Sequence, residues 1–210
     1  MSLINMKRLY ISYVAVYVLT ALTLYPLYTA FELSFQLVPA IKAAITALGA
    51  SFGFVYLVER YIWTWKLFRL LVGIKVPFVH GRWAGFMYSS VSQHKQKYKI
   101  ILEFHQSLHQ LVVWYYDKNA ITQSRLAGFA LNDQDGGPAT IHCVYQNQPV
   151  NTSMRDVQAH SGTMELYLDQ SGSKIKGIYY NNPHQRPTYG NMELSLLGRK
   201  LLGRFEGRGR

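Results

Sequence analysis

Side chains that suit nucleotide recognition gather in the second half of the chain, in segments rich in Tyr, Asn and Gln. Aromatic faces stack on bases, side-chain amides hydrogen-bond to base edges, and a guanidinium pairs with phosphate. We therefore predict a site for a small nucleotide, with candidate contacts Tyr145, Asn147, Tyr180, Asn181, Arg186 and Tyr189. Tyr is also common in β-sheets, so a purely structural role for any one of these residues stays open.

Residue patterns that carry catalysis or hold a metal are absent from the sequence. It contains no GxSxG, P-loop, GxGxxG or HExxH motif, and no nucleophile can be paired with a base. His105 and His109 have i,i+4 spacing, but they straddle a predicted β-turn and do not share a helical face. The single Cys143 excludes an internal disulfide and a CxxC metal site. We expect no enzymatic activity, no metal and no cofactor.

The candidate contacts lie in a region whose hydrophobic pattern has the period of a β-strand. Eight runs with this pattern are separated by turn residues, and they cover residues 80–90, 98–105, 108–116, 124–131, 140–147, 161–169, 174–181 and 188–197. Eight antiparallel strands can close into a barrel that is filled by side chains or holds one small ligand. The predicted fold is an eight-stranded antiparallel minimal β-barrel, with an open sandwich as the alternative.

Two long apolar segments precede the strands. Residues 9–31 carry no charge, and at 1.5 Å per residue this run can cross a hydrocarbon core of about 30 Å. A signal peptide would have a shorter apolar core followed by a cleavage site of small residues. The second segment, residues 37–58, follows after a loop of about five residues, so the two predict an antiparallel transmembrane hairpin.

The positive charge lies beside these segments and at the C-terminus. The net charge is +11, but residues 1–76 carry seven Lys/Arg against two acids, and residues 199–210 carry five against one. This distribution favours a membrane surface over a DNA or RNA duplex as the partner. Because Lys and Arg flank the outer ends of both segments, the positive-inside rule predicts that both termini and the barrel face the cytoplasm.

The second apolar segment contains a GxxxG motif, formed by Gly49 and Gly53. Small residues let helix backbones approach closely, which favours association within a bilayer. The motif predicts either packing on the first helix of the same chain or self-association between chains. An aromatic and basic stretch around residues 61–69 follows and predicts a short helix along the membrane surface.

Several short motifs then appear in a characteristic order: Gly-Arg-Trp-Ala-Gly at 81–85, Ser-Ser at 89–90, Tyr-Gln-Asn-Gln-Pro at 145–149, His-Ser-Gly-Thr at 160–163, Ile-Tyr-Tyr-Asn at 178–181 and Tyr-Gly-Asn-Met-Glu at 189–193. Their order resembles that of the two-transmembrane, β-strand-rich effectors of bacterial CBASS antiphage defence, which are CD-NTase-associated proteins. The resemblance implies a cytosolic barrel that binds a cyclic nucleotide made by a CD-NTase. It also implies that the helices then oligomerise and disrupt the inner membrane, which kills the infected cell.

The predicted organisation has three parts: a two-helix membrane region with its juxtamembrane segment (1–76), a ligand-sensing barrel (77–198) and a basic tail (199–210). The predicted function is that of a cyclic-nucleotide-gated membrane effector of the bacterial inner membrane. One alternative stays open, a membrane-anchored lipocalin-like barrel that carries a small apolar ligand. A membrane-tethered hydrolase would require a nucleophile–base pair, which the sequence does not show. A polar cavity lined by Arg and Tyr would favour the nucleotide, and an apolar cavity would favour a lipid.

Overall fold

A computed structural model describes residues 6–31, 37–118, 120–130, 139–149, 160–184 and 187–205. These residues form two compact units, one within residues 1–75 and the other within residues 76–210.

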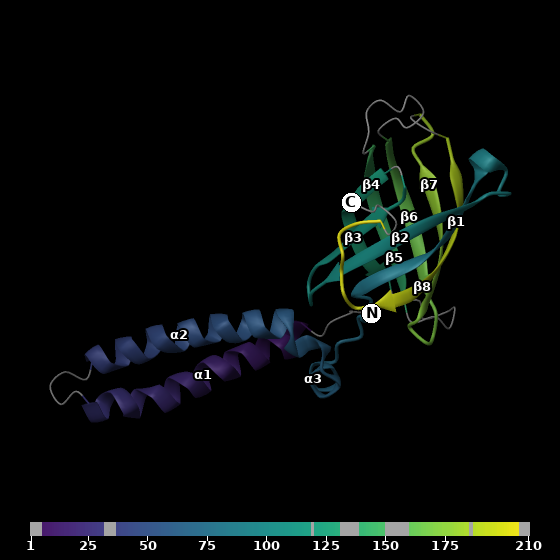
Figure 1. Ribbon diagram of the computed structural model, residues 1–210. Coiled ribbons are helices and arrows are strands. Elements are labelled where there is room, and N and C mark those ends of the chain that lie inside the picture. Colours follow the sequence, from purple (N-terminus) through teal and green to yellow (C-terminus); the bar gives the residue numbers. More distant parts are fainter. Residues whose placement is uncertain are drawn as a thin grey trace. The chain divides into compact units, whose positions relative to one another are not determined.

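The first unit is built on two long helices, α1 (Met6–Phe31) and α2 (Leu37–Arg60), which run side by side as a hairpin (Figure 1). Both are long and apolar enough to span a membrane, over Arg8–Leu27 and Ile41–Arg60, as the sequence predicted. Small and aliphatic side chains pack the pair together: Leu9, Ala43, Ala47 and Val58 are at most 3% exposed. The predicted loop at 32–36 lies outside the described residues.

The two glycines of the GxxxG motif do not contribute to this packing. Gly49 and Gly53 are exposed, and a Cβ built at either position meets no atom within 4 Å. Ala43 and Ala47 instead supply the small residues that face α1, because they lie on the opposite side of α2. Packing of α1 on α2 therefore leaves the glycine face of α2 uncovered within the described chain.

A short 3-10 turn and a short helix follow α2. These elements are η1 (Ile62–Thr64) and α3 (Lys66–Val72), and α3 ends at Gly73, whose left-handed φ of 74° suits glycine. Trp63 is fully buried, and the Arg69 guanidinium lies 5.7 Å from the centre of its ring. The prediction of a short helix is confirmed, while its position along a membrane remains a prediction.

The second unit is a closed antiparallel barrel in which each strand pairs with its sequence neighbours and the last pairs with the first. The alternative of an open sandwich is therefore wrong. The strands are β1 (Gly81–Ser89), β2 (Lys97–Gln106), β3 (Leu111–Tyr116), β4 (Ala120–Ala130), β5 (Thr140–Pro149), β6 (His160–Leu168), β7 (Lys174–Asn181) and β8 (Tyr189–Gly198) (Figure 1). Each strand lies within a few residues of a predicted run.

Glycine makes the seam between β1 and β8 possible. A Cβ at Gly85 would collide with the carbonyl group of Glu193, and one at Gly190 would collide with the carbonyl oxygen of Tyr88. Both contacts are with backbone atoms, which cannot move aside without breaking the pairing of the two strands. The closure of the barrel thus depends on residues without side chains at these two positions.

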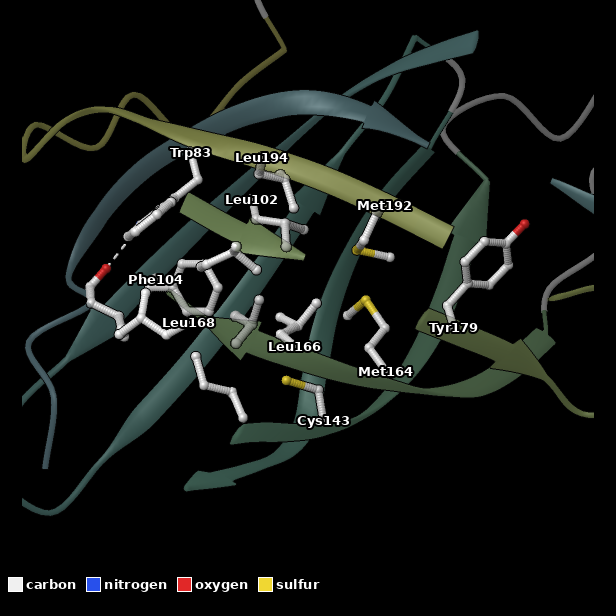
Figure 2. Close-up of a cluster of buried hydrophobic side chains, with 14 of the residues drawn as sticks. Trp83, Leu102, Phe104, Cys143, Met164, Leu166, Leu168, Tyr179, Met192 and Leu194 are labelled. Carbon is white, nitrogen blue, oxygen red and sulfur yellow. Dashed lines mark hydrogen bonds between the residues drawn. The ribbon is translucent and has the colours of Figure 1, made fainter. Parts of the chain in front are cut away.

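One end of the barrel is filled by a hydrophobic core. Trp83, Phe104, Leu166 and Ile175 are fully buried there, and the Trp83 and Phe104 rings meet edge to face. The chain that enters β1 closes this end, because Val79 is also fully buried and its carbonyl accepts a 3.0 Å hydrogen bond from Trp83 Nε1. Figure 2 shows Trp83 and Phe104 at one side of the cluster and Tyr179 at the other, with Met164 and Met192 between them.

The first residues after β8 pack against the outside of the barrel. The backbone N–H groups of Leu202 and Gly203 donate to the Glu103 carboxylate, which is fully buried. Arg199 Nη1 donates to the carbonyl of His80 at 2.6 Å, and its guanidinium stacks over Phe78. Residues 199–205 therefore pack against the outer surface of β2 and against the segment that precedes β1.

Candidate ligand-binding cavity

The barrel interior contains a cavity at the end away from Trp83. It measures about 210 Å³, far more than the voids of a well-packed core. The lining comes from all eight strands or the residues directly beside them: Met87, Ser89, Val91, Tyr98, Tyr115, Asp117, Thr122, Tyr145, Asn147, His160, Met164, Tyr179, Asn181, Thr188 and Met192. The wall next to the hydrophobic core is apolar, and the walls toward the strand ends carry most of the polar groups.

The apolar wall consists of methionines. Met164 and Met192 are buried where the core meets the cavity (Figure 2). Met87 packs against the same cluster and pairs with Met192 across β1 and β8. Four tyrosines, Tyr98, Tyr115, Tyr145 and Tyr179, stand around this wall. Thioether and aromatic side chains offer favourable contacts to flat aromatic groups, because sulfur and ring faces are both polarisable.

A series of hydrogen bonds between side chains crosses the cavity wall from β5, through the end of β7, to the residue before β8. Tyr145 Oη donates to Asn181 Oδ1 at 2.6 Å, and Asn181 Nδ2 donates to Thr188 Oγ1 at 2.5 Å. Burial raises the pKa of Tyr145, so its hydroxyl remains a neutral donor at physiological pH. Gly162 makes room for this ring, because a Cβ there would lie 2.5 Å from Tyr145 Oη. These hydrogen bonds fix the orientation of the Asn181 amide toward the cavity.

A second series of hydrogen bonds links β4, β5 and β6. Thr122 Oγ1 donates to Asn147 Oδ1 at 2.9 Å, and Asn147 Nδ2 lies 3.5 Å from His160 Nε2. Thr122 and His160 are both buried, which places this group inside the barrel wall. Its amide and imidazole can each donate to and accept from a ligand.

The cavity also holds one acid. Asp117 follows β3 directly, and its Oδ2 accepts a 2.8 Å hydrogen bond from Tyr115 Oη. Burial, and then the negative charge of Asp117, raise the pKa of Tyr115 well above its usual value, so this tyrosine also remains a donor. Among the described lining residues Asp117 is the one carboxylate, and none of them is Lys or Arg.

The structure brings half of the predicted contacts into this cavity. Tyr145, Asn147 and Asn181 line it, as described above. Tyr180 and Tyr189 do not, because their side chains are 50% and 54% exposed on the outer face of the barrel. Arg186 lies outside the described residues.

The inward-facing tyrosine of β7 is Tyr179, which the sequence reasoning missed. Successive side chains of a strand point to opposite faces, so Tyr179 and Tyr180 cannot both line the cavity. Lys174 and Lys176 share the parity of Tyr180 and are exposed, whereas Ile175 shares the parity of Tyr179 and is buried. This charge pattern was the signal that identifies the outer face of β7.

Asp117, His160 and Thr122 also went unrecognised as cavity residues. They are brought to the cavity from β3, β6 and β4, and only the closure of the barrel makes these strands face one another. A search of the described residues for three or more clustered His, Cys, Asp or Glu side chains finds no candidate metal site.

Comparison with known proteins adds one match. The family model described as "Cap15, cyclic dinucleotide receptor domain" matches residues 74–195, which is more than half of the chain and includes all the described cavity-lining residues. No curated protein matches the chain. The matched domain is a receptor, a sensor rather than a catalytic domain.

Proposed function

Since the chain belongs to the Cap15 cyclic dinucleotide receptor family, we propose that it is a CBASS effector whose barrel binds the second messenger in the Tyr- and Asn-lined cavity. The observation that carries this proposal is the polar end of an otherwise apolar barrel interior. Two series of hydrogen-bonded side chains present amide and hydroxyl groups there. Such groups recognise base edges, and the tyrosine rings are suited to stacking on base faces. The proposed source of the ligand is a partner CD-NTase.

The charge of the cavity suggests how the ligand is oriented. A cyclic dinucleotide carries two phosphates, and burying them without cations would be costly. The described lining contains no Lys or Arg, so the bases enter the cavity and the phosphates remain toward its mouth. Arg186 is suited to meet them, because it stands two residues before the lining residue Thr188 in the chain.

The proposed output is assembly of the membrane helices. Ligand binding shifts an equilibrium only if the ligand binds one state more tightly, so the bound barrel must favour a state in which the helices associate. The face of α2 that carries Gly49 and Gly53 supports this step, because it is uncovered within the described chain and two of its positions have no side chain. Assembly of these helices would then disrupt the bacterial inner membrane, with both chain termini in the cytoplasm.

A lipocalin-like carrier of an apolar molecule is the competing function. The methionine wall suits an apolar ligand. Such a ligand would, however, displace water from the amide and hydroxyl groups of the lining without offering them hydrogen bonds in return. The polar groups therefore favour the nucleotide.

Adjacent tyrosines on β7 provide a test of the site. The full chain in detergent micelles is titrated by calorimetry with a panel of cyclic dinucleotides, as the parent and as Tyr179→Leu and Tyr180→Leu. Because one base–aromatic stack contributes about 1–3 kcal/mol, Tyr179→Leu is expected to weaken binding at least about fivefold. Tyr180→Leu is the matched control and should bind as the parent does. Equal losses in both variants, or binding of a fatty acid in place of every cyclic dinucleotide, would contradict the proposed site.

The assembly step has its own test. Gly49→Leu with Gly53→Leu adds bulk to the uncovered face while keeping the helix compatible with lipid. Ligand-dependent crosslinking and depolarisation of vesicles should disappear, and ligand affinity should be unchanged. Leu22→Ile, at an exposed position of α1, is the control that should keep full activity. Full depolarisation by the double variant would show that assembly uses another surface.

A further inference from the structure

Asp117 places a carboxylate in a cavity that receives an anionic ligand. Its position is set by two features, the end of β3 and the 2.8 Å hydrogen bond from Tyr115 Oη to Oδ2. Tyr115 is itself tied to the barrel wall, because it pairs with Thr122 across β3 and β4 and lines the cavity with it. The acid is therefore held at a defined place in the lining.

A carboxylate in such a place has a restricted choice of ligand groups. It accepts hydrogen bonds but donates none, and its two oxygens together offer about four acceptor positions. The hydroxyl of Tyr115 donates to one of these oxygens, Oδ2. The carboxylate repels phosphate, since two like charges interact unfavourably even across a partly polar medium. The ligand group beside Asp117 must therefore be a hydrogen-bond donor, either a base N–H or a ribose hydroxyl, and not a phosphate. A base with two adjacent N–H donors can engage both carboxylate oxygens at once.

Resting on the proposed function, we propose that Asp117 selects a guanine base in the cyclic dinucleotide. Guanine presents two parallel donors, N1–H and the exocyclic N2–H, which match the two oxygens of one carboxylate. Adenine and cytosine each place a ring acceptor beside their amino group, and uracil places carbonyl oxygens on both sides of its single N–H. Each of these three bases would bring an oxygen or nitrogen lone pair against the acid.

The expected discrimination follows from the two donors. A well-placed bidentate pair distinguishes one base from another by roughly tenfold to a hundredfold in affinity. A site that hydrogen-bonds a ligand rejects an analogue that lacks the matching group, because the protein group is then left unpaired in the complex. Removal of the N2 amino group alone should therefore produce a measurable loss.

The experiment compares ligands before it compares variants. The full parent chain in detergent micelles is titrated by calorimetry with cyclic di-GMP, cyclic GMP–AMP, cyclic di-AMP, cyclic UMP–AMP and cyclic di-IMP, whose hypoxanthine base lacks the N2 amino group. The two ligands that contain guanine should bind at least about tenfold more tightly than the other three. This comparison requires no substitution and is independent of whether any variant folds.

A pair of variants then assigns the preference to one residue. Asp117→Asn keeps the shape of the side chain but replaces one acceptor with a donor, so the gap between cyclic di-GMP and cyclic di-IMP should shrink at least about fivefold. Glu193→Gln is the matched control on the outer face of β8 and should keep the gap. Thermal unfolding without ligand verifies that both variants are folded.

The outcomes separate this inference from the proposed function. Tightest binding of a ligand without guanine, or an unchanged gap in Asp117→Asn, would overturn guanine selection by Asp117 while the receptor function stands. Binding of none of the cyclic dinucleotides would overturn both.

Discussion

Arg82 and Glu103 form an ion pair on the outside of the barrel that water does not reach. Their neighbours Trp83, Leu102 and Phe104 point into the core, so these two side chains point outward from paired positions on β1 and β2. They are nonetheless 3% and 0% exposed, with Arg82 Nη1 2.5 Å from Glu103 Oε1. We predict that loss of one partner strongly destabilises the barrel and that loss of both costs much less.

The magnitude follows from the remaining partners. Removing one member of a buried ion pair costs about 3–5 kcal/mol, because the other charge is left uncompensated. Arg82→Met leaves Glu103 with the backbone N–H groups of Leu202 and Gly203, so we expect a loss of about 3 kcal/mol. Glu103→Met leaves a buried guanidinium with the carbonyl of Arg204 as an acceptor but with no carboxylate, and it leaves the two N–H groups without their acceptor, so we expect about 5 kcal/mol. The double variant should lose no more than about 2 kcal/mol.

Urea unfolding of the full chain in detergent, followed by circular dichroism of the strands, measures these losses. The matched control is the ion pair of Lys176 and Glu193. Lys176 Nζ lies 3.6 Å from Glu193 Oε1, but the two side chains are 76% and 63% exposed. Exposed pairs contribute about 0–1 kcal/mol, so Lys176→Met and Glu193→Met should change little. Losses at Arg82 and Glu103 as small as in this control, or a double loss equal to the sum of the single losses, would refute the reasoning.

Three further predictions concern buried residues of the barrel and its pH response. Gly162→Val should displace the Tyr145 ring and weaken cyclic dinucleotide binding at least about tenfold, which calorimetry measures; unchanged affinity would contradict the packing of this ring. Burial raises the pKa of the Cys143 thiol to about 12, so native protein at pH 8 should react with iodoacetamide roughly a thousandfold more slowly than unfolded protein, as mass spectrometry can follow. Burial also raises the pKa of Tyr116 to about 12, so the unfolded state releases this proton above pH 10 while the folded state keeps it. The urea midpoint should therefore fall between pH 10 and 12, and a rise would contradict the assignment.

The sequence predicted much of the fold because its signals are local. An uncharged run from residue 9 to residue 31 can satisfy its backbone in a bilayer only as a helix, and the structure has α1 there. Period-two alternation likewise predicted all eight strands, and the count of strands predicted the barrel. In both cases the residues that predict a helix or strand lie within that helix or strand or a few positions from it.

The candidate site was predicted only in part, and the misses have a common origin. Tyr145, Asn147 and Asn181 were recognised from residue type, but residue type alone did not separate Tyr179 from Tyr180. The alternation of side chains along a strand predicts that Tyr179 and Tyr180 face opposite sides of the sheet. Only the charged residues Lys174 and Lys176 indicate which of these sides faces outward.

Sequence alone determined the two apolar helices, the number and order of the strands, and the chemistry available to a ligand. Tertiary structure decided which side chains meet. Asp117, which follows β3, and Asn181, which ends β7, are 64 residues apart in the chain and line one cavity only because β1 pairs with β8. Alternation along β2 places Glu103 on the outer face of the barrel, where a side chain would normally be exposed. It is buried because residues 202 and 203, about a hundred positions later in the sequence, cover it. Contacts of this kind depend on the closure of the whole barrel, which no local pattern of residues encodes.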